Sequence, residues 1–171
     1  INDVLKRAFD IFNQQLKVRG IKVIWSLDNN LPFIQADPVR LEQVFINLVM
    51  NAKDAIEEKW EKQGRRQGAI QEEDDQITII TRQTRDEVFI EIQDTGVGIQ
   101  CETADKLFEP FFTTKEVGKG TGLGLSISYG IIKECSGEIR IEPRASGGTI
   151  VRVSFPVPDG FEEGLTYDNP K

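Results

Sequence analysis

The stretch GKGTGLGLSISYGIIKE, residues 118–134, places four glycines within seven residues, directly before an apolar segment with helical spacing. A helix N-terminus presents unpaired N–H groups and a partial positive charge, and both favour an anion. Glycines in front of it let the backbone approach a phosphate closely. An ordinary surface loop is the alternative, and no Lys-Ser or Lys-Thr follows the last glycine as in a Walker A loop. The expected phosphate cradle comprises Gly118, Lys119, Gly120, Thr121, Gly122 and Gly124.

Hydrophobic periodicity on either side of this stretch predicts the remaining elements. Helices are expected over residues 2–17, with Asn2 as N-cap, 38–60 behind an Asp37-Pro38 start signal, 102–107 and 122–135. Strands are expected over residues 21–27, 77–84, 87–93, 137–142 and 149–155. Residues 64–76 are polar and are expected to form an exposed loop that adds nothing to the core. The pattern predicts a two-layer α+β sandwich, with three main helices on one face of a mixed sheet of about five strands.

Composition excludes several classes of protein. The 171 residues carry a net charge of −7, which argues against a duplex nucleic-acid partner. No apolar run is long enough to span a membrane, and the two separated cysteines predict neither a disulfide framework nor a zinc site. The chain has no histidine, which removes histidine from acid–base catalysis, metal ligation and phosphoryl acceptance. A protein of the reducing cytoplasm without membrane contact fits this composition.

A second motif, Asp94-Thr-Gly-Val-Gly-Ile99, follows a predicted strand. An ionised carboxylate only accepts hydrogen bonds. In a partly buried pocket, Asp94 could accept from the exocyclic amine of adenine, whereas guanine would present a carbonyl oxygen there. Gly96 and Gly98 would let the base lie against backbone. A simple turn after a strand is the alternative.

A third group, Asn47, Asn51 and Asp54, is spaced i, i+4, i+7 beside the apolar stripe of the long helix. Oxygen ligands of this kind suit Mg²⁺, which keeps several waters and would share nucleotide phosphates. The alternative is a hydrated helix flank. In the fourth motif, LFEPFFTTK at residues 107–115, we expect core packing for Phe108 and Phe111 and a partner or hinge contact for Phe112. Lys115 is either solvated or reaches a terminal phosphate.

Together the four motifs resemble those of sensor histidine kinases. Asn47-Leu-Val-Met-Asn51 resembles the N box, Asp94-Thr-Gly-Val-Gly the G1 box, Phe108-Glu-Pro-Phe-Phe the F box and Gly118-Lys-Gly-Thr-Gly-Leu-Gly-Leu the G2 box. The resemblance covers residues 21–158, and FEPFFTTK is most similar to kinases of the nitrogen-regulation and dicarboxylate-sensing type. The wider relatives are the GHKL ATPases, whose Bergerat fold binds ATP in an α/β sandwich.

The resemblance implies ATP and Mg²⁺ as cofactors and assigns roles to residues. Asn51 would hold Mg²⁺, with Asn47 beside it on phosphate or water, and these two would be the catalytic residues. Asp94 would bind adenine N6, supported through water by Thr149, while Gly98 packs at the base. The complete set expected to bind nucleotide is Asn51, Asp54, Asp94, Gly96, Gly98, Ile99, Lys115, Gly118, Lys119, Gly120, Thr121, Gly122, Leu123, Gly124, Leu125 and Thr149.

The resemblance also implies domains and partners. Residues 21–158 would be the catalytic domain, 1–20 a junction from a histidine hairpin outside the chain, and 159–171 a flexible tail. The γ-phosphoryl group would pass to that dimerisation hairpin of a homodimeric parent kinase and then to a response regulator; the chain alone would not phosphorylate itself. The alternatives are an ATP-driven clamp, expected to carry glutamate in place of Asn47, an anti-sigma-type serine kinase, and a non-catalytic binding module.

Overall fold

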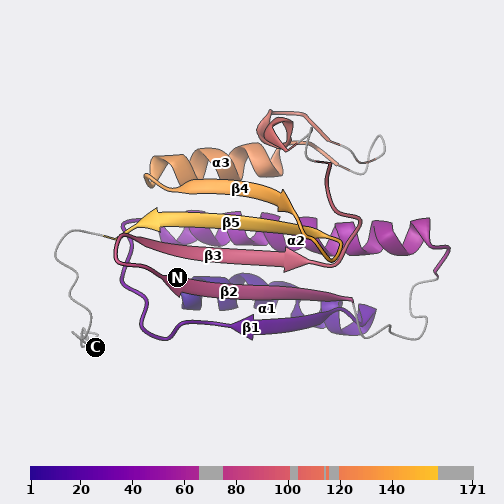
Figure 1. Cartoon of the computed structure of the whole chain (residues 1–171), viewed down its shortest axis with the longest axis horizontal. Coiled ribbons are helices and arrows are strands. Elements are labelled where there is room, and N and C mark those ends of the chain that lie inside the picture. The colour runs from indigo at the N-terminus through magenta and orange to yellow at the C-terminus, as the bar shows by residue number, and fades with distance from the viewer. Residues whose placement is uncertain (66–74, 101–103, 114, 116–119, 158–171) are drawn as a thin grey trace.

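A computed structural model describes residues 1–65, 75–100, 104–113, 115 and 120–157 (Figure 1). The elements in chain order are α1 (Asn2–Arg19), β1 (Lys22–Ser26), α2 (Pro38–Lys62), β2 (Gln76–Gln83), β3 (Glu87–Asp94), the 3₁₀ helix η2 (Asp105–Phe108), α3 (Gly124–Glu134), β4 (Glu138–Pro143) and β5 (Thr149–Pro156). They agree with the predicted set to within a few residues at each end. The short helix was expected over 102–107, of which 102 and 103 lie outside the described residues, and the described part is a 3₁₀ helix over Asp105–Phe108.

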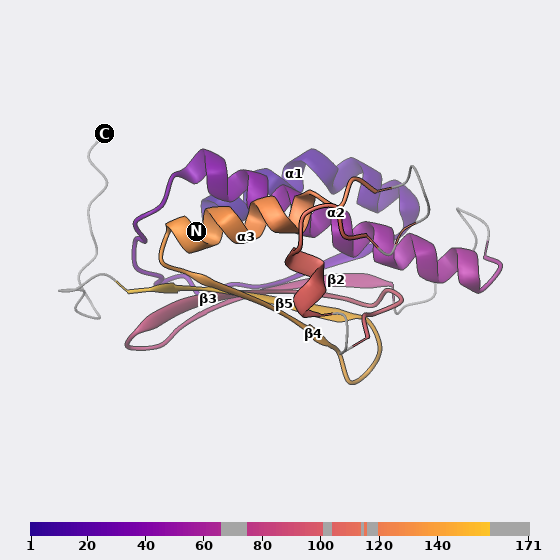
Figure 2. The same ribbon diagram turned by 90° about the horizontal axis from the view of Figure 1, so that it is seen from above.

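The five strands form one mixed sheet in the order β1-β2-β3-β5-β4. β1 and β2 are parallel, because the long helix α2 carries the chain back between them. The other three pairings are antiparallel. All three α-helices lie over one face of the sheet, as the view from above shows (Figure 2). The predicted two-layer α+β sandwich is therefore confirmed.

Helix α2 is the central element of the helical layer. Its N-terminus forms where the sequence predicts, because the Asp37 side chain accepts a hydrogen bond from Val39 N at 2.8 Å and Pro38 occupies the first turn. α1 packs along α2 on one side and α3 on the other. The stripe that α2 buries between its neighbours and the sheet consists of Leu41, Val44, Phe45, Leu48, Val49, Ala52, Ile56 and Trp60.

Two local predictions are wrong. Asn2 is not an N-cap: Ile1 holds that position, and the Asn2 amide instead donates to Asp28 O and accepts from Thr81 Oγ1. Hydrogen bonds to residues distant in sequence thus take the place of the local N-cap bond. Of the loop expected to be exposed over residues 64–76, residues 66–74 lie outside the described residues, and Asp75 near its end is buried, with only 2% exposure.

Candidate functional site

A cavity of about 530 Å³ lies between α2, the sheet and the segment that joins β3 to α3. Its apolar walls come from strand residues Ile92, Ile141 and Val151 and from Leu48 on α2. It is large enough for a nucleotide-sized ligand. The sequence-predicted site residues that line it are Asn47, Asn51, Asp54, Asp94, Gly98, Ile99, Lys115, Gly120, Thr121, Gly122, Gly124, Leu125 and Thr149.

Asp94, at the end of β3, places a buried carboxyl group in the wall of this cavity and is 4% exposed. Its Oδ1 accepts from Gly96 N at 2.8 Å and from Thr149 N at 3.3 Å. Burial raises the pKa of the Asp94 carboxyl to about 6, against the opposing effect of these hydrogen bonds and of the Arg144 charge. Because each carboxylate oxygen has two lone pairs, Asp94 keeps acceptor capacity for a ligand.

Close backbone contacts fix the turn after β3. A Cβ on Gly96 would lie 2.5 Å from Ala55 C, and Val97 N donates to Ala55 O at 3.1 Å, so the turn rests directly on α2. A Cβ on Gly148 would lie 2.0 Å from Asp94 O, and Gly148 has φ +96°. Gly96 therefore does not line the cavity; its N–H holds the Asp94 carboxylate instead. Gly148, which the sequence indicated only as a turn, does not line the cavity either, but its backbone packs against Asp94 O, a contact that the prediction missed.

Asn47 and Asn51 on the polar flank of α2 both line the cavity, and Asn47 also bonds to α3. Asn47 Nδ2 donates to Gly124 O at 3.2 Å and to Ser128 Oγ at 3.3 Å, which joins α2 to the first turns of α3. Only its amide oxygen is left to accept from a ligand. Asn51, one helical turn further, also lines the cavity, and its side chain makes no hydrogen bond to any residue in the described part of the chain.

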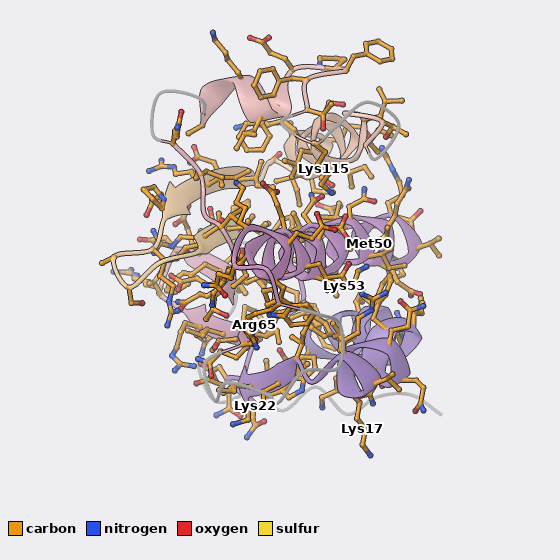
Figure 3. All side chains as sticks on the ribbon, turned by 90° about the vertical axis from the view of Figure 1, so that its right-hand side faces the viewer. Lys17, Lys22, Met50, Lys53, Arg65 and Lys115 are labelled. Atoms are coloured by element: carbon orange, nitrogen blue, oxygen red, sulfur yellow. The ribbon has the colours of Figure 1, made fainter. Side chains whose placement is uncertain are left out.

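Asp54 forms an ion pair that the sequence did not predict. Lys115 Nζ lies 2.5 Å from Asp54 Oδ2, and Lys53 Nζ lies 3.1 Å from Asp54 Oδ1. Burial alone would raise the pKa of Asp54, but the hydrogen bonds and charges of Lys115 and Lys53 outweigh it and hold that pKa below its ordinary value. Figure 3 shows Lys115 on the α3 side of α2 and Lys53 on the α1 side.

The remaining predicted residues fall in three places. Leu123 is the N-cap residue of α3 and does not line the cavity. Gly118 and Lys119 lie outside the described residues. Phe112 lines the cavity, while Phe111, expected in the core, is 75% exposed.

The prediction that the Phe111 side chain packs in the core is wrong, because it is the Phe111 backbone that contacts the glycine segment before α3. Phe111 N donates to Gly122 O at 3.0 Å, and Phe111 has φ 67°. Gly122, with φ 66°, lies so close that its Cβ would meet Phe111 C at 2.5 Å. Phe108 does pack on the core, as predicted, with its ring 5.2 Å from that of Tyr129. Further lining residues that the sequence reasoning missed are Met50, Ala55, Glu58, Val97 and Thr113.

Known proteins resemble this chain in sequence. Residues 36–159 match the family described as histidine kinase-, DNA gyrase B-, and HSP90-like ATPase. The sensor kinase CckA of Brucella abortus (strain 2308) is 42% identical over 72% of this chain and 13% of its own length. Sporulation kinase E of Bacillus subtilis (strain 168) is 32% identical over 95% of this chain and 20% of its own. The C4-dicarboxylate transport sensor protein DctS of Rhodobacter capsulatus is 34% identical over 92% and 22%. The chain thus spans less than a quarter of each of these relatives.

Solved structures resemble it in fold. The catalytic domain of histidine kinase ThkA, in a nucleotide-free form, superposes with a TM-score of 0.74 at 30% identity, covering 92% of both chains. ThkA in complex with the response regulator protein TrrA superposes with a TM-score of 0.70 at 28% identity, covering 92% of this chain and 40% of that one.

Proposed function

The chain belongs to the histidine kinase-, DNA gyrase B-, and HSP90-like ATPase family, and on that premise we propose that its cavity binds Mg-ATP and presents the γ-phosphoryl group to a histidine on a separate dimerisation hairpin. The observation that carries the proposal is the buried Asp94 carboxylate, which is held by two backbone N–H groups in the wall of a nucleotide-sized cavity. Its acceptor capacity suits the exocyclic amine of adenine. Guanine would place a carbonyl oxygen against it.

The other end of the cavity suits the phosphates. Gly120, Gly122 and Gly124 bring backbone to its wall at the start of α3, an eleven-residue helix whose N-terminal N–H groups favour an anion. Lys115 supplies a cation there and Thr121 a hydroxyl. The phosphates would then compete with Asp54 for the Lys115 ammonium.

The donor set fits Mg²⁺ only as part of the nucleotide. Within the described residues there is no group of three His, Cys, Asp or Glu side chains that could hold a metal ion. The Asn51 carboxamide lines the cavity and has no hydrogen-bond partner among the described residues. One oxygen from it, together with nucleotide phosphates and waters, makes a shell that Mg²⁺ accepts. Asn51 would hold the ion, which would neutralise charge on the transferring group.

In this proposal the chain itself positions the nucleotide and supplies no histidine to accept the phosphoryl group. Phosphoryl transfer depends mainly on alignment and on neutralising charge, which the α3 N-terminus and Lys115 provide. The acceptor must come from another segment, because the sequence contains no histidine. We assign that role to the hairpin of the same homodimeric parent kinase, and the next acceptor to a response regulator, since the related ThkA forms a complex with one. We place the domain in the cytoplasm, as the resemblance to sensor histidine kinases implies. None of the described helices is long and apolar enough to cross a membrane.

An ATP-hydrolysing clamp is the principal alternative. Such a clamp needs a base on α2 to activate water, but the amide of Asn47 cannot take a proton and is committed to Gly124 O and Ser128 Oγ. An anti-sigma-type serine kinase would share the fold but transfer phosphate to a hydroxyl.

One experiment separates these functions. The chain is mixed with a separately produced histidine hairpin of a related kinase and γ-labelled ATP, and the label on the hairpin is followed. We expect acid-labile, base-stable phosphate on the hairpin and none without it. Acid-stable phosphate would indicate a serine kinase, and free phosphate released without the hairpin would indicate a clamp.

A further inference from the structure

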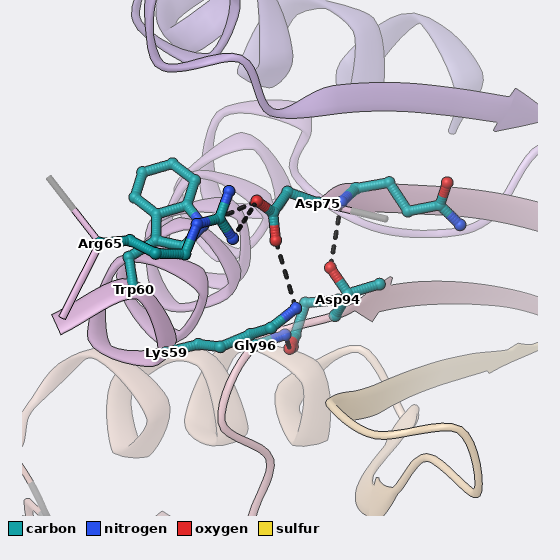
Figure 4. A network of polar contacts seen from close by, with 8 residues as sticks. Lys59, Trp60, Arg65, Asp75, Asp94 and Gly96 are labelled. Carbon is teal, nitrogen blue, oxygen red and sulfur yellow. Dashed lines mark hydrogen bonds and ion pairs between the residues drawn. The ribbon is translucent and has the colours of Figure 1, made fainter. Parts of the chain in front are cut away.

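A cluster of charged and polar side chains around the buried Asp75 lies next to the turn that carries Asp94 (Figure 4). The proposed function assigns no role to this cluster. Asp75 Oδ2 accepts from Trp60 Nε1 at 2.7 Å and lies 3.0 Å from Arg65 Nη1, while Oδ1 lies 3.2 Å from Lys59 Nζ. The Arg65 guanidinium also stacks 5.7 Å from the Trp60 ring centroid. With 2% exposure, Asp75 depends on these donors, because an unpaired buried carboxylate is strongly unfavourable.

The Asp75 cluster joins three elements. Lys59 and Trp60 belong to the last turns of α2, and Asp75 immediately precedes β2. Its backbone oxygen accepts from Lys22 N, the first residue of β1, at 2.9 Å. The side chain and backbone of Asp75 thus fix the start of β2 against both α2 and β1.

The start of β2 in turn holds the turn that carries Asp94. Gln76 N donates to Thr95 Oγ1 at 3.0 Å, and Thr95 lies between Asp94 and Gly96. On its other side this turn rests on Ala55 of α2, through Val97 N. Ala55 and Lys59 lie one helical turn apart, about 6 Å along the axis. The turn is therefore held at two points, one directly on α2 and one through Asp75 and Gln76.

We propose that Asp75 is a positioning residue for purine recognition, which acts through Gln76 N–H and Thr95 Oγ1 to orient the Asp94 carboxylate. This inference rests on the proposed function, because it assumes that Asp94 accepts from adenine. Asp75 touches no ligand; it sets where Asp94 points, and hence the preference for adenine over guanine nucleotides.

The test compares Asp75→Asn with Thr81→Val in the full 171-residue chain. Thr81 is a matched control: it is buried like Asp75 and lies on β2, about 20 Å along the extended chain from Asp75. Its Oγ1 donates to Asn2 Oδ1 and accepts from Asp28 N. Urea unfolding measures stability, and calorimetry measures the affinities for the non-hydrolysable imido analogues of ATP and GTP.

We expect both variants to unfold at lower urea. Only Asp75→Asn should bind the adenine nucleotide about tenfold more weakly, the effect of about one hydrogen bond, and should show a smaller adenine-to-guanine affinity ratio. A folded Asp75→Asn with parental affinity and ratio would overturn the proposal, as would an equal loss in Thr81→Val. A parent chain that binds neither nucleotide would instead refute the proposed function itself.

Thr95→Val tests the same path without disturbing the buried charge, and it decides the matter if Asp75→Asn does not fold. It removes the acceptor of Gln76 N and keeps the side-chain shape, so it should reproduce the loss of affinity and of adenine preference. Parental behaviour of Thr95→Val would overturn the path. Where both variants fold, the double variant should bind about as weakly as either single one, because both break one path. Additive losses would show that Asp75 acts elsewhere.

Discussion

Replacing Asp94 by Asn should stabilise the fold while it removes nucleotide binding. Burial raises the pKa of the Asp94 carboxyl from an ordinary value of 3.8 to about 6. The folded state therefore binds this proton more tightly than the unfolded state. The contribution of the Asp94 carboxyl to stability is thus greatest below pH 4 and is lost as the pH rises through 6. At 1.36 kcal/mol per pKa unit, the ionised carboxylate costs about 3 kcal/mol above pH 7. Asn carries no charge, and its Oδ1 can still accept from Gly96 N and Thr149 N.

Urea unfolding of both chains at pH 5 and pH 8 measures this effect. Asp94→Asn should be the more stable chain at pH 8, and its advantage should shrink by about 1.4 kcal/mol at pH 5, where the parental carboxyl is mostly protonated. Asp54→Asn is the control of opposite sign: the pKa of Asp54 is lowered by Lys115 and Lys53, so loss of that carboxylate should destabilise the chain at pH 8. An Asp94→Asn chain less stable than the parent at pH 8, or an advantage that does not change with pH, would refute the reasoning.

Three further predictions concern binding and backbone. Affinity for the imido analogue of ATP should fall about tenfold from pH 7 to pH 5, beyond any change seen with the deaminated purine nucleotide. The reason is that the ionised fraction of Asp94, the form that only accepts hydrogen bonds, falls about tenfold over this range. Parallel calorimetric titrations of the two nucleotides check this. Asn51→Ala should abolish the Mg²⁺ dependence of that affinity, and a dependence that persists would assign the ion to Asn47 or elsewhere. Gly148→Ala should lower the free energy of unfolding by about 3 kcal/mol or more, since its Cβ would lie 2.0 Å from Asp94 O. The control Gly147→Ala meets nothing within 4 Å and should show only the cost of its positive φ. Equal losses of stability in urea unfolding of the two variants would contradict the contact.

The fold could be predicted from sequence because its signals are local. Asp37-Pro38 marks the start of α2, and the stripe of that helix has one unbroken period from Leu41 to Ile56. The alternating apolar residues and the turns between them likewise predicted the strands of the sheet. What escaped prediction depends on partners that are distant in sequence. Asn2 bonds Thr81, and Asp75 bonds Trp60 across a segment that looked like solvent-exposed loop, so neither follows from its neighbours.

The candidate site was predictable to the same degree and for the same reason. The motif residues Asn51, Asp94 and Gly120 were chosen by type and spacing, and the fold brings all three to one cavity. Their roles toward a nucleotide stay predictions. The Lys115–Asp54 pair and the contact of Gly148 with Asp94 could not be inferred, because each joins segments whose separation only the folded chain sets.

The position of Asn47 explains why this architecture would need a partner for chemistry. The Asn47 amide joins α2 to α3 through Gly124 O and Ser128 Oγ, so the residue at the proposed phosphate end of the cavity is a structural link and not a base. A carboxylate there could activate water but could not donate to Gly124 O, because it has no proton to give when ionised. The hydrogen bonds that fix the start of α3 are therefore incompatible with a water-activating acid at the same place. If the proposed function holds, a domain built this way would bind ATP without hydrolysing it until a nucleophile from another segment is in place.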